Sequence, residues 1–370
     1  MTFSRSTAYS PYMEWAKLHS AAKFNLATSG MLNFPLAQLG VTIDQLEING
    51  PSIYGYEPLL QAIARRYRVP QECVVSAVGT SMANYLALAA TTEPGDEILV
   101  EQPTYELLLS TARYLGLEIK RFPRRAENNF AIDLADVERN LTGRTRLIVI
   151  CNLHNPTGAL TPDSTLRELG RLAQKAGACV MVDEVYREML FEEAPQSSFL
   201  LDPERFIVTN SLTKAYGLSG LRCGWVFASP ELARRMFRIN DLHGATFAHP
   251  AELLSVIAFH KLGAIAADMK STLEVNRKLL RDFLASRDEL EYFWPENGTI
   301  AFPRLKHGSV KAFSRLLRDE FETSLVPGEF FEDPQRFRVG VGAPTESVRE
   351  ALQQLSRGLD RYKAAALAGV

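Results

Sequence analysis

From residue 57 onward the chain alternates between helical and strand-like patterns of apolar residues. Apolar positions recur at the spacing of one helix face over residues 57–67, and an apolar run at 73–78 is typical of a strand. The alternation continues in four further segments: a helix at 82–89, a strand at 98–100, a helix at 105–115 and a strand at 147–150. Such repetition of strands and helices predicts βαβ units and a parallel sheet.

Two later strands are apolar along their whole length. The runs 180–182 and 206–208 contain no polar residue, as expected for strands of a parallel sheet that is covered by helices on both faces. The helix before the first of them has marked ends, because Thr161 suits the N-cap, Pro162 the first helical position and Gly177 the residue past the end. We therefore predict an α/β fold with three layers and a mostly parallel sheet.

The pattern changes in the last third of the chain. After a further strand at 222–228 and one more helix, residues 251–290 are almost entirely helical. Short strands follow at 299–302 and 336–341, and an amphipathic helix begins at Thr345. This order of helices and short strands is typical of a smaller α+β domain joined by a long helix. The predicted division has three parts: an N-terminal arm with part of the small domain (1–50), a large domain (51–245), and an interdomain helix with a small C-terminal domain (246–370).

Composition excludes several classes of function. The chain has 370 residues, of which 46% are hydrophobic and 23% charged, enough for a large core and more than one domain. A net charge of -2 gives no basic field, so neither nucleic acid nor a membrane is expected as a partner. The amino end shows no signal-peptide pattern, and no apolar stretch of membrane-spanning length is expected. The four cysteines are scattered and form no C-x-x-C pair. A cytoplasmic protein with buried free thiols is expected.

Lys214 follows an apolar strand, in the sequence Ser211-Leu212-Thr213-Lys214. Ligands of open α/β sheets bind beyond the carboxyl ends of the strands, so this lysine is expected at the binding crevice. A lysine whose pKa is lowered by burial or a nearby cation can form an imine with an aldehyde. The alternative is a solvated loop lysine. Ser211 and Arg222 weigh against it, because a hydroxyl and a guanidinium both bind phosphate.

Two other strand ends bring polar residues to the same crevice. Asp183 ends the strand at 180–182, and its carboxylate can pair with a pyridinium nitrogen and keep that electron-withdrawing ring protonated. Tyr186 and Asn155 can donate hydrogen bonds to an oxygen on the ring. Taken alone, Asp183 is better explained as a helix cap and Tyr186 as a packing aromatic. Together with Lys214, they suit an enzyme that holds pyridoxal phosphate.

Gly79-Thr80-Ser81 ends a strand and opens a helix. The unpaired N–H groups and the positive dipole end at such a position favour an anion, which makes this segment a candidate for the other side of a phosphate site. On its own, one glycine before a helix is ordinary turn chemistry. The segment lacks the G-x-G-x-x-G spacing of a dinucleotide site, which disfavours a nicotinamide oxidoreductase.

In combination and order, these motifs resemble the signature of the class I/II aminotransferases, the fold type I pyridoxal-phosphate enzymes. The motifs are Asn155-Pro156-x-Gly158, Asp183-x-x-Tyr186 and Ser211-x-x-Lys214 with Arg222. The resemblance implies that Lys214 forms the imine with the cofactor and that Asp183 faces the pyridine nitrogen. It implies that Asn155 and Tyr186 bind the ring oxygen. The phosphate site that it implies consists of the segment from Gly79 with Thr80, Ser81, Ser211 and Arg222.

Three residues outside these motifs gain roles from the same resemblance, which runs from about Tyr54 to Arg338. Tyr105 corresponds to the aromatic residue that stacks on the cofactor ring. Tyr54 corresponds to the tyrosine that reaches the phosphate of the neighbouring subunit, so a homodimer with shared active sites is implied. Arg338 corresponds to the arginine that binds the substrate α-carboxylate, a task that suits a bidentate guanidinium. If the resemblance failed, Arg338 would be a surface arginine on an edge strand.

The N-terminal loop departs from the family's pattern. The family usually has a glycine followed closely by a proline, whereas here Gly30 precedes Pro35 at a looser spacing. We expect Gly30 beside the substrate, and the loop does not identify that substrate. Four further residues are candidates for the side-chain pocket: His154, His243, Met31 and Asn33. For His154 a structural hydrogen-bonding role is at least as well supported. No metal site is expected.

The resemblance implies an aminotransferase that moves an amino group from an L-amino acid to a 2-oxo acid. Lys214 is then expected to carry a proton between the substrate α-carbon and the cofactor. The same scaffold supports lyases, decarboxylases, racemases and cyclases, and the core motifs do not separate these from transaminases. A third alternative is a sensor that binds the cofactor without catalysis. The chain has no helix-turn-helix extension or basic segment that would favour it.

Overall fold

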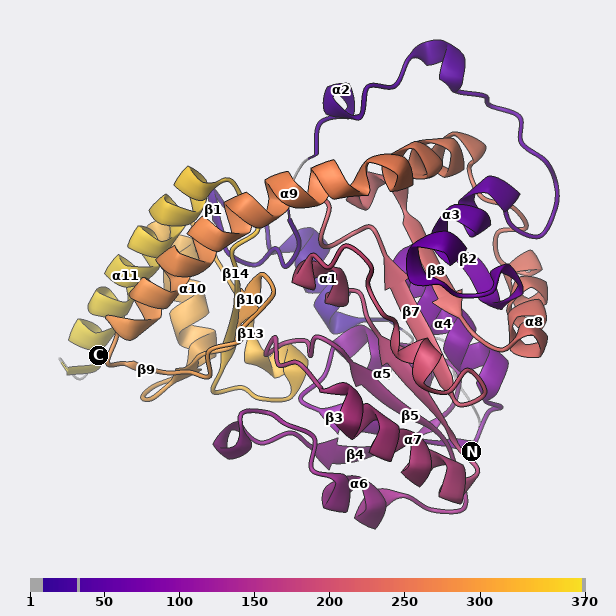
Figure 1. The fold of residues 1–370 in the computed structure, drawn as a ribbon. Coiled ribbons are helices and arrows are strands. Elements are labelled where there is room, and N and C mark those ends of the chain that lie inside the picture. Colours follow the sequence, from indigo (N-terminus) through magenta and orange to yellow (C-terminus); the bar gives the residue numbers. More distant parts are fainter. Residues whose placement is uncertain (1–8, 32–33, 368–370) are drawn as a thin grey trace.

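A computed structural model describes residues 9–31 and 34–367. Its centre is one sheet of seven strands (Figure 1). Their order is β2 (Val74–Val78), β8 (Cys223–Phe227), β7 (Phe206–Ser211), β6 (Cys179–Asp183), β5 (Thr145–Cys151), β3 (Glu97–Gln102) and β4 (Glu118–Pro123). The pairs from β7 to β4 are parallel, and β8 runs antiparallel to both of its neighbours. The sheet is therefore mostly parallel, as predicted.

Helices from the first two thirds of the chain pack on the sheet: α3 (Glu57–Tyr67), α4 (Gly79–Thr91), α5 (Glu106–Tyr114), α6 (Leu134–Asn140), α7 (Asp163–Ala176) and α8 (Pro230–Asp241). They cover both faces, because successive strand residues point to opposite sides. Val180 of β6 belongs to the hydrophobic cluster that contains Leu166 of α7. The next residue, Met181, belongs to a second cluster that contains Leu86 of α4. The prediction of a three-layer α/β architecture is confirmed.

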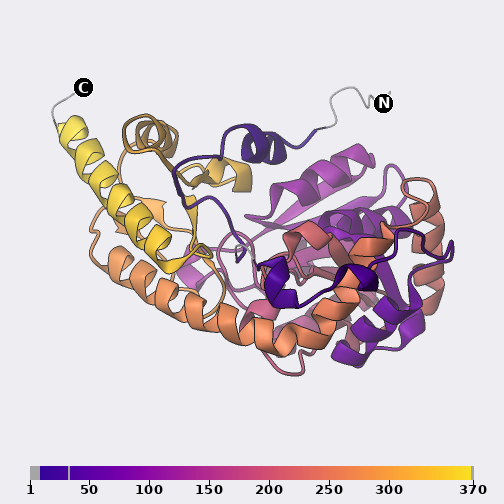
Figure 2. The same ribbon diagram turned by 90° about the horizontal axis from the view of Figure 1, so that it is seen from above.

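A smaller part follows the sheet along the chain (Figures 1 and 2). Its elements are α9 (His249–Ala285), β9 (Leu290–Glu291), β10 (Ile300–Ala301), β11 (Arg304–Leu305), α10 (Val310–Phe321), β12 (Thr323–Ser324), β13 (Val326–Pro327), β14 (Phe337–Gly340) and α11 (Thr345–Leu367). In it, β14 pairs antiparallel with β10 and β13, β9 pairs with β11, and α10 packs on α11. These small sheets beside long helices match the predicted α+β character.

The N-terminal segment contacts both parts of the molecule. Its helix α1 (Pro11–Leu18) packs near α5, and β1 (Phe24–Asn25) pairs in parallel with β12. The chain then passes through the short helix α2 (Leu36–Leu39) along an extended path outside the body before it enters α3 (Figure 1). The division of the chain near residues 50 and 245 stays a prediction.

The helix α9 corrects one expectation from the sequence. By length and composition alone, it is long and apolar enough to cross a membrane, so the expectation that no apolar stretch approaches that length was wrong. The helix packs against α3 near its start and against α11 further along. Its buried residues include Ala258, Leu262, Ile265 and Leu273, which belong to the main hydrophobic cluster. These apolar positions are therefore used in packing between the two parts.

Two further local features differ from the sequence prediction. Thr161 is not the N-cap of α7, because the helix begins at Asp163 and Pro162 occupies the cap position. The backbone of Thr161 instead pairs with the side-chain amide of Asn152, and its hydroxyl accepts a hydrogen bond from Arg124 at 3.3 Å. The strand β4 was not predicted, since its sequence EIKRFP is largely polar and only its pairing with β3 makes it a strand.

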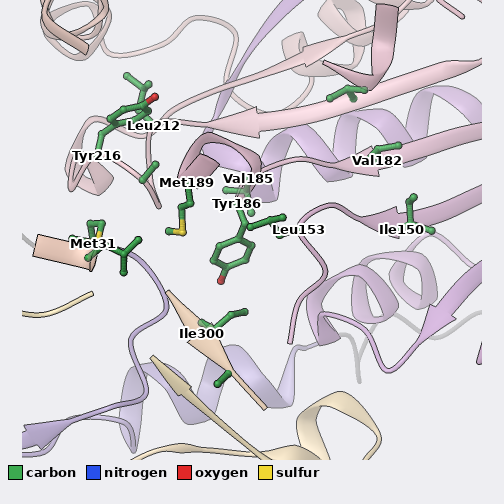
Figure 3. Close-up of a cluster of buried hydrophobic side chains, with 14 of the residues drawn as sticks. Met31, Ile150, Leu153, Val182, Val185, Tyr186, Met189, Leu212, Tyr216 and Ile300 are labelled. Carbon is green, nitrogen blue, oxygen red and sulfur yellow. The ribbon is translucent and has the colours of Figure 1, made fainter. Parts of the chain in front are cut away.

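An apolar cluster joins the carboxyl ends of the large sheet to the smaller part (Figure 3). Tyr186 and Met189, which follow β6, belong to the same cluster as Ile300 of β10 and Met31 of the N-terminal segment. All four side chains are less than 5% exposed. Burial of this much apolar surface holds the N-terminal segment and β10 against the loops that follow the parallel strands. The site described next lies at this junction.

Candidate active site

A cavity of about 230 Å³ lies beyond the carboxyl ends of β5, β6 and β7. Cys151 at the end of β5, Asp183 at the end of β6 and Lys214 just after β7 all line it. Parallel strands end at the same edge of the sheet, so side chains distant in sequence converge there. Nine of the residues singled out in the sequence line this cavity: Thr80, Ser81, Tyr105, Asn155, Asp183, Tyr186, Lys214, Arg222 and Arg338.

The carboxylate of Asp183 is buried and held by two donors. Its Oδ2 accepts a hydrogen bond from Asn84 Nδ2 at 2.9 Å, and its Oδ1 accepts one from the backbone N–H of Val185 at 3.0 Å. Asn84 is itself oriented by the hydroxyl of Thr209, which donates to its Oδ1 at 2.6 Å. Burial raises the pKa of Asp183 to about 6, although both donors and the charge of Lys214 act in the opposite direction. The carboxyl group therefore lacks a close cationic partner strong enough to offset its burial.

A group of anion-binding elements forms one end of the cavity. The hydroxyl of Thr80 donates to Ser211 Oγ at 2.8 Å, and Thr80 lies in the first turn of α4, where backbone N–H groups have no partner within the helix. The N–H of Gly79 donates to the carbonyl of Arg222 at 2.7 Å. Gly79 has a φ of +70°, and a Cβ there would lie 2.4 Å from a terminal nitrogen of Arg222. Glycine at this position thus lets the guanidinium approach the start of the helix. We call Gly79, Thr80, Ser81, Ser211 and Arg222 the anion site.

Lys214 is half-buried, and its side-chain amine donates a hydrogen bond to Ser29 Oγ at 3.0 Å. Burial, together with the cations of Arg338 and Arg222, lowers the pKa of Lys214 to about 8, while the carboxylate of Asp183 acts in the opposite direction. The amine lies 6.0 Å from the centre of the Tyr186 ring. The lysine is therefore not the solvated loop residue of the alternative interpretation.

Arg338 is 1% exposed, yet its guanidinium is bound only to neutral acceptors. Its terminal nitrogens donate to Asn155 Oδ1 at 3.0 Å, to the hydroxyl of Tyr12 at 3.0 Å and to the carbonyl of Ala27 at 3.2 Å. Its Nε has no partner among the described residues. No carboxylate in the described part of the chain pairs with it. A buried cation without a counter-ion is costly, which favours an anionic ligand at this position.

Three aromatic residues, Tyr12, Tyr105 and Tyr186, are among the residues that line the cavity. Tyr105 and Tyr12 meet edge to face with their ring centres 5.7 Å apart. The Tyr105 hydroxyl contacts the sulfur of Met13 at 3.7 Å. Burial raises the pKa of Tyr186 to about 12, with Arg338 and a hydrogen bond to Ser29 acting in the opposite direction. Tyr186 is therefore a neutral hydrogen-bond donor at physiological pH.

The remaining residues named from the sequence lie at varied distances from the cavity. Gly30 packs directly against Lys214, since a Cβ there would lie 3.1 Å from the lysine Cδ. Tyr54 does not line the cavity of its own chain; it is exposed, and its hydroxyl donates to Asp241 Oδ2 at 2.9 Å.

The candidates for the side-chain pocket do not meet at the cavity. His154 is buried and bound to Thr157 and to the carbonyl of Pro103, so its structural interpretation fits better. Burial lowers the pKa of His154 well below its usual value. His243 bonds the hydroxyl of Tyr85, and Met31 is part of the core cluster. Asn33 lies outside the described residues.

The cavity residues that the sequence analysis did not assign to the site include Tyr12, Ser29 and Asn84. Asn84 lies one turn after Ser81 in α4, so its place on the same helix face as the anion site was a usable signal. Tyr12 lies on an eight-residue helix and contacts Arg338 across 326 positions of sequence. No local pattern indicates such a contact.

Comparisons with known proteins identify the family of this chain. Residues 42–355 match the family described as aminotransferase class I and II. Capreomycidine synthase from Streptomyces vinaceus is 30% identical over 366 residues, which cover 95% of this chain and 94% of that protein. A PLP-dependent aminotransferase from Streptococcus suis 89-1591 has a TM-score of 0.89 at 27% identity, covering 98% of this chain and 99% of that one. The PLP-dependent cyclase OrfR has a TM-score of 0.86 at 26% identity, covering 95% and 97% of the two chains. The chain therefore belongs to the class I and II aminotransferases, a family of fold type I enzymes that use pyridoxal phosphate.

Proposed function

We propose that this chain binds pyridoxal phosphate in the cavity and moves an amino group from an L-amino acid to a 2-oxo acid. One observation carries the proposal: the buried Arg338, which has no counter-ion among the described residues, lines the same cavity as Lys214, an amine of lowered pKa. The first suits a carboxylate, and the second suits an aldehyde. An α-amino acid and the cofactor together supply these two groups.

The residues of the cavity fit the cofactor's chemistry. The anion site offers hydroxyls, a helix N-terminus and Arg222 for the phosphate. Burial raises the pKa of the Asp183 carboxyl, and a pyridinium N–H would supply a cationic partner for it. Tyr186 and Asn155 would hold the ring oxygen, and Tyr105 would cover the ring face. When bound, pyridoxal phosphate supplies an aldehyde that reacts with amines and a ring that withdraws electrons from the substrate α-carbon.

Lys214 supplies an amine that is partly neutral near physiological pH. With a pKa of about 8, about a quarter of the molecules carry the neutral amine at pH 7.5, whereas a pKa of about 10.5 would leave about a thousandth. The neutral form is the nucleophile and the proton acceptor, and the charged form returns the proton. Both forms are therefore available at Nζ without a large change in free energy.

Arg338 fixes the orientation of the substrate. Its two terminal nitrogens are held by Asn155, Tyr12 and the backbone of Ala27, so the plane of the guanidinium is set before a ligand binds. A carboxylate bound in two places to such a plane cannot rotate freely, which places the α-carbon in a defined direction relative to Lys214. The rigid support also means that little entropy is lost when the substrate binds.

We propose in addition that the active unit is a homodimer. Large apolar side chains are exposed along the segment that leads to α3, with Ile43 90% and Ile48 89% exposed, and the segment runs outside the body (Figure 1). Tyr54 at its end is 57% exposed and away from its own cavity. A second copy of the chain would cover these residues and receive Tyr54 near its anion site. Light scattering should give twice the chain mass, and a mixture of Tyr54→Phe and Lys214→Ala chains should recover activity above either variant alone.

The proposed reaction is tested by a half-reaction. Cofactor-loaded protein is mixed separately with each common L-amino acid and no acceptor, and absorbance and 2-oxo acid are followed. A transaminase converts the cofactor aldehyde to its amine form, releases one equivalent of 2-oxo acid per site and then stops until an acceptor is added. Turnover beyond one equivalent without an acceptor would contradict transamination. No change with any amino acid would contradict it as well.

A cyclase is the second candidate, and the comparisons are the observation that favours it. Capreomycidine synthase matches 95% of the chain, which is more than residues 42–355 of the family match. A PLP-dependent cyclase is also among the similar structures. Such an enzyme would use Arg338 and Lys214 in the same way and return the cofactor aldehyde after each turnover. In the half-reaction above it would show product without acceptor and without lasting loss of the aldehyde.

A further inference from the structure

The backbone around Ser29 is clamped against the loop that carries Lys214. The N–H of Met31 donates to the carbonyl of Lys214 at 2.7 Å, and a Cβ at Gly30 would lie 3.1 Å from the lysine Cδ, a tight contact. The carbonyl of Ser29 accepts a hydrogen bond from Thr299 Oγ1 at 2.6 Å. Ser29 itself is 4% exposed. These contacts hold the backbone of Ser29 in place, so its side chain starts from a fixed position within reach of the lysine amine.

The opposite side of the segment is equally constrained. A Cβ at Gly340 would lie 2.0 Å from the carbonyl oxygen of Thr28, and a Cβ at Gly342 would lie 2.1 Å from that of Gly30. The end of β14 therefore approaches the segment backbone to backbone, which only glycine allows. Since β14 also carries Arg338, the same contact ties Ser29 to the carboxylate end of the cavity.

The hydroxyl of Ser29 contacts the lysine amine. It accepts a hydrogen bond from Lys214 Nζ at 3.0 Å, and the same amine lies 6.0 Å from the centre of the Tyr186 ring. A hydroxyl oxygen can accept a hydrogen bond from an amine, whereas an apolar side chain cannot.

We propose that Ser29 is a positioning residue for the catalytic amine, holding Lys214 Nζ at the cavity wall formed by Tyr186. Without this acceptor the four-carbon lysine stem is free to adopt other rotamers, and the amine has no fixed position between the anion site and Arg338. The inference rests on the proposed function only in taking Lys214 as the reacting amine. The contact itself does not depend on which amino acid is used or on the fate of the product.

The charges around the amine set the expected size of the effect. Asp183 from β6, Arg338 from β14 and Arg222 from the turn before β8 act on Lys214, and Tyr186 faces it as a neutral phenol. Removing the Ser29 hydroxyl leaves these groups in place and takes one acceptor from a buried ammonium. The charged form is then disfavoured, and the pKa of Lys214 falls by roughly one unit.

The test measures the lysine directly in full-length protein from which the cofactor has been removed. Acetylation of Lys214 by acetic anhydride is followed by mass spectrometry from pH 6 to pH 10, which gives the pKa of the amine. The variants are Ser29→Ala and Ser29→Cys, the second keeping the side-chain volume with a poor acceptor. The matched control is Thr28→Val, which removes the neighbouring hydroxyl, whose contact is a long one of 3.4 Å to Asn25.

Both Ser29 variants should label about tenfold faster than wild type at pH 6.5, because a lower pKa increases the neutral fraction by that factor. Thr28→Val should label within twofold of wild type. Wild-type labelling profiles in both Ser29 variants would overturn the proposal. An equal shift in Thr28→Val would also overturn it, since the backbone segment and not the hydroxyl would then be responsible. No amino acid turnover is needed, so failure of the transamination assay and failure of this test are distinguishable.

Discussion

Replacing Arg338 by lysine tests the assignment of the substrate carboxylate. The variant keeps a positive charge in the buried position but loses the planar fork that grips a carboxylate in two places. One charge-assisted hydrogen bond to the substrate is then lost, worth about 1.5–3 kcal/mol. At about 1.36 kcal/mol for each factor of ten, the second-order rate constant of the half-reaction with the amino acid should fall roughly 10- to 200-fold.

The assay compares two donors that differ only in the carboxylate. One is the most reactive L-amino acid of the panel, and the other is the amine that remains when its carboxylate is removed. Arg338→Lys should slow the half-reaction with the amino acid by the factor above and the half-reaction with the amine by less than threefold, because the amine never contacts the arginine. Arg336→Lys is the matched control. Arg336 is also buried and nearby, but it pairs with Asp333 at 3.1 Å and does not line the cavity.

Equal slowing of both donors in Arg338→Lys would refute the reasoning, because the loss would then come from a general change in the cavity. The same conclusion would follow if Arg336→Lys slowed the amino acid as strongly as Arg338→Lys. In both cases the buried guanidinium would have a structural role, and its missing counter-ion would need another explanation.

Two further predictions concern the cofactor's binding residues. Gly79→Ala should weaken pyridoxal phosphate binding at least tenfold in equilibrium dialysis, because its Cβ would displace Arg222. The control Gly177→Ala should bind the cofactor as wild type does, because Gly177 has a similar φ of +72° but open space around it. Equal affinities of the two variants would contradict the argument. In cofactor-free protein, the carboxyl of Asp183 has a folded pKa of about 6 and an unfolded value near 3.8, so its burial is tolerated below pH 4 and destabilises the fold as pH rises through 6. The stability of Asp183→Asn relative to wild type should therefore increase by about 2 kcal/mol between pH 4 and pH 7 in urea titrations, and a difference that does not change with pH would be the contrary result.

The sequence predicted the sheet well because its strands are buried on both faces. Runs such as 180–182 and 206–208 are apolar throughout, and their burial in the centre of the sheet leaves little ambiguity. The edge strand β4 was missed for the opposite reason, since it is half-exposed and polar. The N-cap of α7 was misplaced because Thr161 is used by Asn152 and Arg124, two partners that only the tertiary structure brings close.

The site was predictable as far as it depends on strand ends. Asp183 and Lys214 follow buried strands, and parallel topology brings such ends together without further information. Tyr12 and Ser29 belong to a segment with weak periodicity, and their positions depend on pairing with β12 and on glycines of β14 more than 300 residues later. Those contacts are set by the whole fold, and a local pattern does not contain them.

The most direct measurement is the site of covalent attachment. Full-length protein is loaded with pyridoxal phosphate, reduced with borohydride, digested and analysed by mass spectrometry, with Lys214→Ala treated in parallel. We predict one pyridoxyl group per chain, on the peptide that contains Lys214, and none in the variant. A label on another lysine, or an equal label in Lys214→Ala, would contradict the central claim that this amine, next to Asp183 and Arg338, binds the cofactor aldehyde.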